Sequence, residues 1–422
     1  INYNKMMKLA RIALLRGAKN SAITSVKRNL TQASTKSLVC LEHRTLLRLT
    51  GQEVPDFLQG LITNDMRHLK EGAASIYSVF LNTKGRVLYD TIIYKALEAD
   101  TYFVECDLAV VDGLLKHLKI YRLRRTVDIQ PMNSSMKIWS VFDDNIVPQN
   151  DDNKNDSKLE GRIFPCGSGD NNSSKLIDKI SIYSDPRILD LGLRVLTESS
   201  VTDTEIIKHL EPSLTKRKCA SSYRAFRYNQ GIGEGVQDLP PGSSFPLEIN
   251  CDYLHGVSFH KGCYIGQELT ARTHHTGVVR KRLMPLTLSC PSSDVSIEFD
   301  EKIVNESGKI VGKIRGHEGI YGLGLIRIAE ALAAKTLTVK ECILKVVKPQ
   351  WWPQESNKVE ASLKTRWKQF LQAVQKTSDH SQKVENHLQR AFKTLVVYGN
   401  VIFVTWRNVM ITKEQNLHLQ SI

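Results

Sequence analysis

The chain of 422 residues carries 58 Lys and Arg against 44 Asp and Glu, which gives a formal net charge of +14. A chain of this length can bury a sizeable core and corresponds to two or three domains. Such a basic total would suggest a nucleic acid or an acidic membrane as the partner. However, residues 1–36 supply +8 of it with no Asp or Glu, so the remainder carries only +6 (14 − 8) and nucleic-acid binding is not indicated.

Residues 1–36 combine Lys and Arg with apolar residues and scattered Ser and Thr. This amphipathic, acid-free composition is typical of a mitochondrial transit peptide. The apolar run 12–15 is too short for a secretory signal, and nowhere does the chain reach the roughly 18 apolar residues of a transmembrane helix. We therefore expect import into the mitochondrial matrix, a true start at Met6 or Met7, and no membrane insertion.

From residue 37 onward the pattern indicates a mixture of strands and helices. Runs of alternating or β-branched apolar residues predict strands at 38–41, 45–49, 75–81, 87–96, 101–106, 121–129, 137–142 and 192–196. Helical spacing predicts a helix with Pro55 in its first turn and further helices at 108–119, 202–210 and 221–231. Residues 143–175 are poor in apolar side chains and rich in Asn, Asp, Ser and Gly, which indicates a flexible surface loop.

Beyond residue 282 the segments become short and are separated by Gly, Ser and Pro. They predict strands at 284–288, 295–299, 302–304, 310–314, 321–328 and 342–347, a pattern that favours a small antiparallel β-barrel at 283–353. Residues 354–422 form an extension of unknown role. Within it, 358–394 has helical spacing and 395–406 is an apolar run that we interpret as a buried strand pair or core segment.

The stretch around Cys263 has the chemistry of a reactive thiol. Gly262 and Gly266 allow the backbone to bend tightly. Lys261 lies two residues before the thiol and favours the thiolate, and a helix that begins near Gln267 would add positive potential from its amide groups. The sequence therefore predicts an activated thiol on a turn at the start of a helix.

Other interpretations of the cysteines stay open at this point. Most cysteines in a chain of this size are inert core residues. Cys251, His255, His260 and Cys263 offer four zinc ligands, but their spacing does not match the common zinc patterns. All eight cysteines are dispersed without a CxxC pair, which argues against a disulfide scaffold and against a resident iron–sulfur cluster with clustered ligands.

The string Lys261-Gly262-Cys263-Tyr264-Ile265-Gly266-Gln267-Glu268, followed by Arg272, Gly277 and Arg280, resembles the signature of the YgfZ family of folate-binding, aminomethyltransferase-like proteins. Further matching segments are 57–65, 84–86, 121–124, 227–232, 245–248, 322–327 and 351–353. The resemblance covers about residues 37–353 and is closest to the mitochondrial branch of the family, an iron–sulfur cluster assembly factor. It implies an α+β fold, with a T-protein-like folate-binding domain at 37–282 followed by the C-terminal β-barrel.

The resemblance also implies a ring-like domain whose central cavity binds tetrahydrofolate. By analogy the cavity is lined by Asn64, Asp65, Tyr121, Arg122, Arg227 and Glu248. A basic lining suits the glutamate tail of a folate, because Arg pairs bidentately with carboxylates. Cys263 and Lys261 would be the reactive groups at the rim, with Gly262, Tyr264, Gly266, Gln267, Glu268 and Arg272 as the rest of the motif.

Two functions follow from this resemblance as hypotheses. In the first, the protein supports the maturation of [4Fe–4S] client enzymes alongside A-type scaffold proteins, with no stable metal and no turnover of its own. Cys263 would then be a transient ligand of an iron–sulfur cluster, a transient disulfide partner or a one-carbon acceptor. In the alternative, the protein is a folate-dependent one-carbon (aminomethyl) transferase, with Asp65 as the acidic group near the folate.

Overall fold

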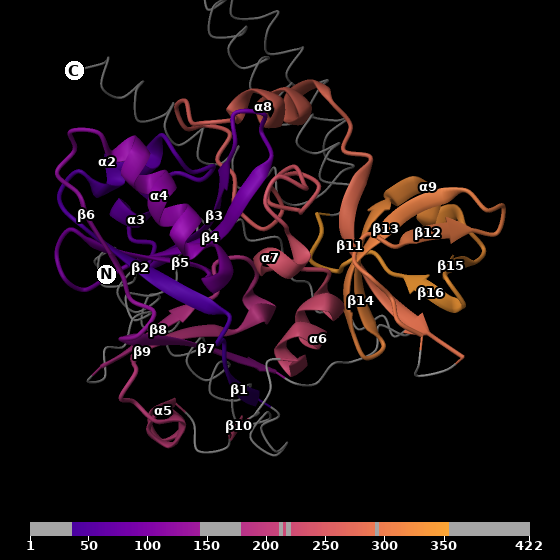
Figure 1. The fold of residues 1–422 in the computed structure, drawn as a ribbon, viewed down its shortest axis with the longest axis horizontal. Helices are drawn as coiled ribbons and strands as arrows, with labels where there is room; N and C mark the ends of the chain where they lie inside the picture. The colour runs from indigo at the N-terminus through magenta and orange to yellow at the C-terminus, as the bar shows by residue number, and fades with distance from the viewer. Residues whose placement is uncertain (1–35, 144–178, 211–213, 217–220, 292–294, 354–422) are drawn as a thin grey trace, which may run out of the picture. The chain divides into compact units, whose positions relative to one another are not determined.

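The computed structural model describes residues 36–143, 179–210, 214–216, 221–291 and 295–353 (Figure 1). The expected transit peptide, nearly all of the expected loop at 143–175, and the extension at 354–422 lie outside the described residues. The described residues up to Trp352 belong to one compact unit. Among them, no helix has both the length and the apolar character that a bilayer span needs.

The first sheet is a five-stranded antiparallel sheet with the strand order β3-β4-β5-β2-β6. Its strands are β2 (Arg44–Thr50), β3 (Ser75–Leu81), β4 (Val87–Lys95), β5 (Thr101–Asp107) and β6 (Asp128–Pro131). Three helices pack on one face: α2 (Val54–Gln59), α3 (Arg67–Lys70) and α4 (Val111–Arg122), the last preceded by the 3-10 turn η1 (Leu108–Val110). The apolar residues at helical spacing, among them Phe57, Leu58, Leu114 and Leu118, form a core with the strands.

The second sheet has the order β10-β1-β7-β9-β8. Its strands are β1 (Lys36–Cys40), β7 (Met136–Asp143), β8 (Ile180–Ser184), β9 (Leu193–Glu198) and β10 (Thr215–Lys216), with the 3-10 turn η2 (Leu189–Leu191) before β9. Only the pairing of β1 with β10 is parallel among these described strands. Helix α5 (Asp203–Leu210) packs Ile206 against Leu38 and Trp139 of this sheet.

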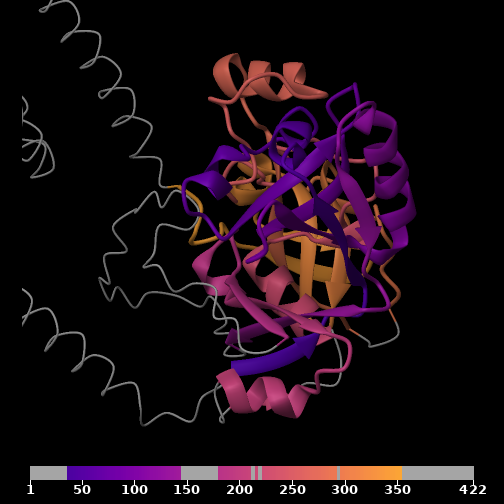
Figure 2. The same cartoon turned by 90° about the vertical axis from the view of Figure 1, so that its left-hand side faces the viewer.

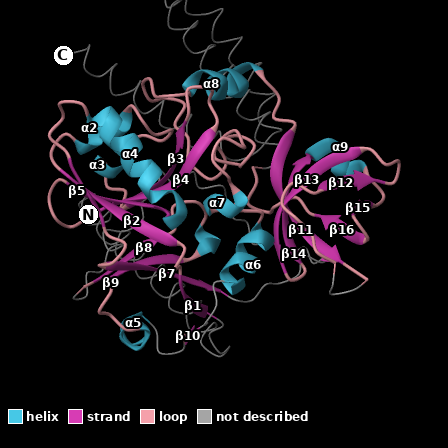
Figure 3. Cartoon of the chain, viewed as in Figure 1, coloured by secondary structure: helices cyan, strands magenta, loops and turns pink. Residues whose placement is uncertain are grey.

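Two helices lie between the sheets and the C-terminal strands (Figures 1 and 3). Helix α6 (Ser221–Gln230) contacts β11, β13 and β14, and the short α7 (Gly235–Asp238) contacts β4, β5 and β13. Phe226 on α6 stacks on Phe142 of β7, with ring centroids 4.8 Å apart. The indole Nε1 of Trp351 donates a hydrogen bond to the carbonyl of Gln230 (2.8 Å). One core therefore runs from the second sheet through α6 to the barrel.

The C-terminal strands close into an antiparallel barrel in the order β11-β14-β13-β12-β15-β16. They are β11 (Lys281–Ser289), β12 (Lys302–Asn305), β13 (Ile310–Glu318), β14 (Tyr321–Arg327), β15 (Leu337–Val339) and β16 (Cys342–Val346), with α9 (Ile328–Ala333) after β14. Gly322 and Gly324 leave room inside for Leu288 and Leu286, since an added Cβ would lie 2.7 Å and 2.9 Å from their side chains. The expected α+β fold with a small C-terminal barrel is confirmed.

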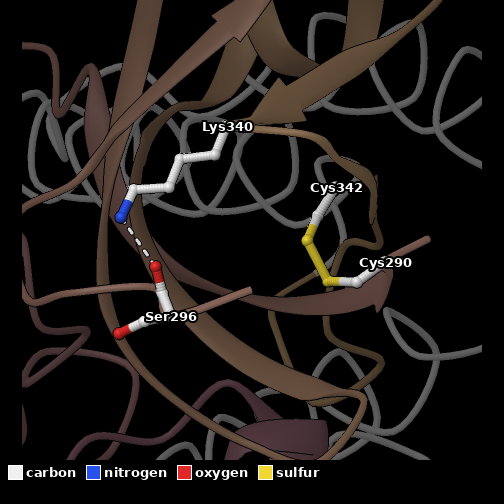
Figure 4. The surroundings of a disulfide bond; sticks show 4 residues. All are labelled: Cys290, Ser296, Lys340 and Cys342. Atoms are coloured by element: carbon white, nitrogen blue, oxygen red, sulfur yellow. Dashed lines mark hydrogen bonds between the residues drawn. A yellow bond between two sulfur atoms is a disulfide. The ribbon is translucent and has the colours of Figure 1, made fainter. Parts of the chain in front are cut away.

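A disulfide joins Cys290, just after β11, to Cys342, the first residue of β16 (Figure 4). The dispersion of the cysteines did not indicate this pair, because the two residues are 52 positions apart in the sequence. Barrel closure brings them together, since β11 and β16 pair up to Ser289 opposite Ile343. This disulfide is the one bridge among the cysteines that the structure describes.

Two predicted strands are wrong. The segment 121–129 continues α4 up to Arg122, and Leu123 then turns the chain with a positive φ of 51°. Only Asp128–Pro131 is a strand there. The segment 295–299 is not a strand, although Lys340 donates to the carbonyl of Ser296 (2.6 Å; Figure 4) and holds this segment beside the barrel.

Candidate functional site: the Cys263 loop

Residues 257–266 form a loop that leads into α8 (Gln267–Thr276), so the expected helix start is confirmed. Gly266 caps the helix with a φ of 78°. An added Cβ at this position would lie 2.4 Å from the carbonyl oxygen of Asn82 in the turn between β3 and β4. Figure 1 shows α8 above the ends of these two strands, and the view in Figure 2 agrees. Only glycine fits both this backbone conformation and this close approach.

The loop is hydrogen-bonded to the segment Gly60–Asn64 at both of its ends. On one side the Ser258 amide donates to the carbonyl of Thr63 (3.0 Å), and on the other the Ile265 amide donates to the carbonyl of Gly60 (3.1 Å). Within the loop, the Tyr264 amide donates to Oε1 of Gln267 (3.2 Å). Through this last bond, the motif residue Gln267 helps to hold the loop at the start of α8.

Cys263 lies on the outer side of this loop. Gly262 and Cys263 are exposed, whereas the residues on either side of them, Lys261 and Tyr264, are buried. The other described free cysteines differ: Cys40 is half-buried, and Cys106 and Cys251 are buried. Burial raises the pKa of the Cys106 thiol to about 12 and that of Cys251 well above its usual value. Cys263 is therefore the described free thiol that a partner can reach.

Lys261 directs its ammonium into the protein. Its Nζ donates to the carbonyls of Ile62 (2.7 Å) and Asn64 (2.6 Å), and it lies 5.1 Å from the centre of the Tyr264 ring. Burial lowers the pKa of Lys261 to about 7, while the nearby Asp65 carboxylate opposes this shift. Sequence adjacency alone had suggested that this lysine serves the thiol, and the structure instead commits its ammonium to two carbonyl oxygens.

The remaining motif residues lie on α8, and the possible zinc ligands do not form a site. Glu268 and Arg272 are exposed on α8. Cys251 is buried beside Tyr77, so it does not share a surface with Cys263. No group of three or more His, Cys, Asp or Glu is arranged to hold a metal ion in the part of the chain that the structure describes.

Asn64 and Asp65, two residues expected to line a folate cavity, are bound to their own surroundings. The Asn64 amide donates to the carbonyls of Tyr77 (2.7 Å) and His255 (2.8 Å) and accepts from the Asp65 amide. Asp65 accepts from Gln59 and, through both oxygens, from Arg67. Burial alone would raise the pKa of Asp65, but these hydrogen bonds hold it well below the usual range.

Of the other four expected folate residues, three have hydrogen-bond partners of their own and Tyr121 is exposed. Tyr121 and Arg122 end α4, where Tyr121 is exposed and Arg122 donates to the carbonyl of Val127. Glu248 accepts from the amide of Phe245 (3.1 Å). Arg227 is buried in α6 and donates to Asp238 (2.8 Å) and to the carbonyl of Ile232 (2.9 Å).

Arg227 belongs to a buried ion network between the sheets. Its members are 0–6% exposed and comprise the four guanidinium groups and five carboxylates of Arg44, Arg187, Arg194, Arg227, Asp90, Glu105, Asp185, Glu234 and Asp238. Four network atoms have no hydrogen bond among the described residues. Arg227 Nε and Glu234 Oε1 lie 3.8 Å apart. The other two are Nε and Nη1 of Arg194, whose Nε lies 3.5 Å from an oxygen of Asp185. Because five carboxylates face four guanidinium groups, this network offers no net positive charge to a folate tail. The network residues as placed therefore do not fit the glutamate tail of tetrahydrofolate.

An open groove of about 250 Å³ runs beside α8. Its lining comes from three separate segments, Phe245–Glu248, Leu269–Thr273 and Val278–Lys281, so most of these residues were not recognisable as a group from the sequence. This volume is smaller than the roughly 300–1,000 Å³ of typical small-molecule pockets.

Comparison with known proteins places this chain in a family. A family model for the CAF17 C-terminal β-barrel domain matches residues 280–354. The mitochondrial iron–sulfur cluster assembly factor IBA57 of Mus musculus is 38% identical over 332 residues, which cover 74% of this chain and 84% of that protein. The Homo sapiens protein of the same name is 36% identical, with coverages of 75% and 85%.

A solved structure shares the fold. The glycine cleavage system aminomethyltransferase T of Bartonella henselae matches with a TM-score of 0.56 at 12% identity, covering 77% of this chain and 88% of that one. At this identity the likeness concerns the fold alone. The sequence relatives are similar over more than four fifths of their own length, and the chain therefore belongs to the family of mitochondrial iron–sulfur cluster assembly factors IBA57.

Proposed function

We propose that this protein is a mitochondrial iron–sulfur cluster assembly factor in which Cys263 is the group that contacts the cluster. The family relationship supports the general role and the mitochondrial location. The observation that supports Cys263 is its exposure on a loop whose neighbouring residues are buried. The more specific elements of this proposal are that residues 1–36 are a transit peptide, that the protein works in the matrix, and that its clients are [4Fe–4S] enzymes.

One exposed thiolate cannot hold a cluster by itself, since iron–sulfur clusters are usually held by four cysteine ligands. The remaining ligands must come from a cluster-carrying partner, for which an A-type scaffold protein is our proposal. In that complex, the Cys263 thiol releases its proton to solvent and its sulfur forms a bond to iron. One existing bond between iron and a ligand of the carrier breaks in exchange, and no electron is transferred.

The alternative function, a folate-dependent aminomethyl transfer, finds no support in the placement of the residues. Asp65 is committed to Arg67 and Gln59, and Arg227 is committed to Asp238. We therefore propose that the protein acts through complex formation and without turnover of its own.

The test is anaerobic mixing of the protein with a [2Fe–2S]-loaded A-type scaffold, followed by visible circular dichroism. We expect a new spectrum with the wild-type chain and none with Cys263→Ser. Cys40→Ser, which changes a half-buried cysteine, serves as the matched control and should behave as wild type. If Cys263→Ser gives the same new spectrum as the wild type, Cys263 does not contact the cluster.

A further inference from the structure

We propose that Lys261 is a positioning residue, which holds the turn that carries Cys263 against the segment Ile62–Asn64 and thereby fixes where the thiolate meets the cluster. This inference rests on the proposed function of Cys263. It differs from the expectation from sequence, in which the lysine activates the thiol. The two roles differ in what they predict for the chemical reactivity of Cys263 when Lys261 is replaced: no change for a positioning residue and a decrease for an activator.

Lys261 attaches its own loop to a neighbouring backbone segment. Its side chain is 6% exposed, and its Nζ donates to the carbonyls of Ile62 (2.7 Å) and Asn64 (2.6 Å). The Ile265 amide binds the same segment at Gly60 (3.1 Å). Gly262 and Cys263 lie between these two attachment points and are exposed. The thiol thus sits on a short span that is fixed on both sides.

The segment to which Lys261 binds is itself held firmly. The Thr63 hydroxyl donates to the carbonyl of Gly256 (2.6 Å) and accepts from the Val79 amide (3.1 Å). The Asn64 amide connects Tyr77 on β3 with His255. Through these contacts the Lys261 ammonium links the cysteine turn to the first sheet.

Burying a lysine is costly unless its donors are bound, so packing alone does not account for this residue. A methionine would fill a similar volume without a donor. What the Lys261 amino group adds, in its charged or its neutral form, is N–H donors directed at two carbonyls on a rigid segment. A cluster ligand needs such positioning, because sites in proteins depend on side chains held within about 0.5 Å of the productive geometry.

The experiment compares Lys261→Met with wild type in three measurements: alkylation of Cys263 by iodoacetamide followed by mass spectrometry of its peptide, hydrogen exchange of residues 260–265, and the circular dichroism of the complex with the [2Fe–2S]-loaded scaffold. Lys84→Met is the matched control, because it removes one positive charge from an exposed position in the turn that contacts Gly266.

For Lys261→Met we expect alkylation within about twofold of wild type, because the thiol stays exposed. Hydrogen exchange in the loop should become about tenfold faster, the factor that corresponds to the loss of one strong hydrogen bond. The signal of the cluster complex should fall about tenfold or more. Lys261→Arg keeps the charge and the donors and should recover part of this signal, and Lys84→Met should match wild type in all three measurements.

Two results would overturn the proposal. One is slowed alkylation with unchanged hydrogen exchange, which would identify Lys261 as an activator of the thiol. The other is no change in exchange or cluster signal. If Lys261→Met does not fold, hydrogen exchange of the wild-type protein tests the proposal. Unprotected amides at Tyr264 and Ile265 would show that the loop is not held in place, and the proposal would be wrong. Failure of the proposed function itself is recognised separately, by a cluster complex that persists with Cys263→Ser.

Discussion

Gly266 occupies the position at which the Cys263 loop turns into α8. Its φ of 78° lies in the left-handed region, and the backbone of Asn82 leaves no room for a side chain. Gly262, at the other end of the same short stretch, has no atom within 4 Å of the position a Cβ would take. Gly266 is therefore required for steric reasons, whereas no contact prevents a side chain at Gly262.

We expect Gly266→Ala to lower the free energy of unfolding by about 1–3 kcal/mol, because the substitution strains the backbone and forces a contact with Asn82. It should also weaken the cluster complex by displacing the loop. Gly262→Ala should change stability by less than about 0.5 kcal/mol. Chemical denaturation of both variants measures this difference, and equal stabilities would show that the turn tolerates a side chain.

The motif was recognisable from its residues, but the direction of its side chains was not. The glycines, the lysine and the cysteine identified the loop, and the start of α8 followed from the chain after Gly266. The partners of Lys261 are carbonyls 197 and 199 residues upstream in the sequence. Backbone acceptors at such a separation leave no signal in a single sequence.

At the level of elements, the pattern of apolar residues was sufficient for strands that are largely buried, such as β3, in which every residue is buried. It located β3, whose bounds Ser75–Leu81 are those predicted, and most of the barrel. It failed at 121–129, because Tyr121 and Arg122 complete the last turn of α4 although their neighbours have strand propensity. Short edge elements such as β15 (Leu337–Val339) are defined by their pairing with β12 and β16 rather than by composition.

The disulfide between Cys290 and Cys342 should stabilise the barrel. In the chain-entropy account, a bridge across 52 residues contributes about 4 kcal/mol by restricting the unfolded chain. We expect a reductant to lower the melting temperature of the wild type, and Cys290→Ser to reproduce this decrease and to be insensitive to the reductant. A reductant effect of the same size in Cys290→Ser would assign the stabilisation to another thiol.

On the scale of the whole molecule, the buried ion network connects the two sheets. Arg44 on β2 pairs with Glu105 (2.8 Å) on β5 and Asp90 (3.0 Å) on β4. Arg194 on β9 of the second sheet pairs with Glu234, which also forms an ion pair with Arg187 (2.8 Å). Each charge is compensated locally, so loss of one partner leaves a buried, unpaired charge.

Glu234→Gln should therefore cost about 3–5 kcal/mol of stability at neutral pH, the range observed when one member of a buried pair is removed. Glu98→Gln, which alters an exposed pair with Arg48, should cost less than about 1 kcal/mol. Urea unfolding of both variants tests the contrast. A similar small effect for both would mean that the network contributes little.

The contribution of Glu234 to the free energy of unfolding is expected to decrease as the pH falls. Burial alone would raise the pKa of Glu234, but Arg194, Arg187 and Arg227 outweigh it and hold the pKa well below its usual value. A carboxylate with a lowered folded-state pKa stabilises the protein above its unfolded pKa of about 4.3 and loses this effect as the pH falls. The difference in stability between wild type and Glu234→Gln should therefore narrow below about pH 4. A difference that widens with acidification would contradict this assignment.

The same network decides whether the interior can accept a folate. A folate tail carries carboxylates, and the four buried guanidinium groups already face five carboxylates. Binding would require breaking a buried pair and leaving a carboxylate uncompensated, which costs several kcal/mol. We therefore expect a calorimetric titration with tetrahydrofolate to show no saturable binding below about 1 mM, with a folate-binding aminomethyltransferase as the positive control. Saturable micromolar binding that Arg227→Met abolishes would contradict this expectation. It would show that the ion pairs of the network break when folate binds and fill the site only in the absence of the ligand.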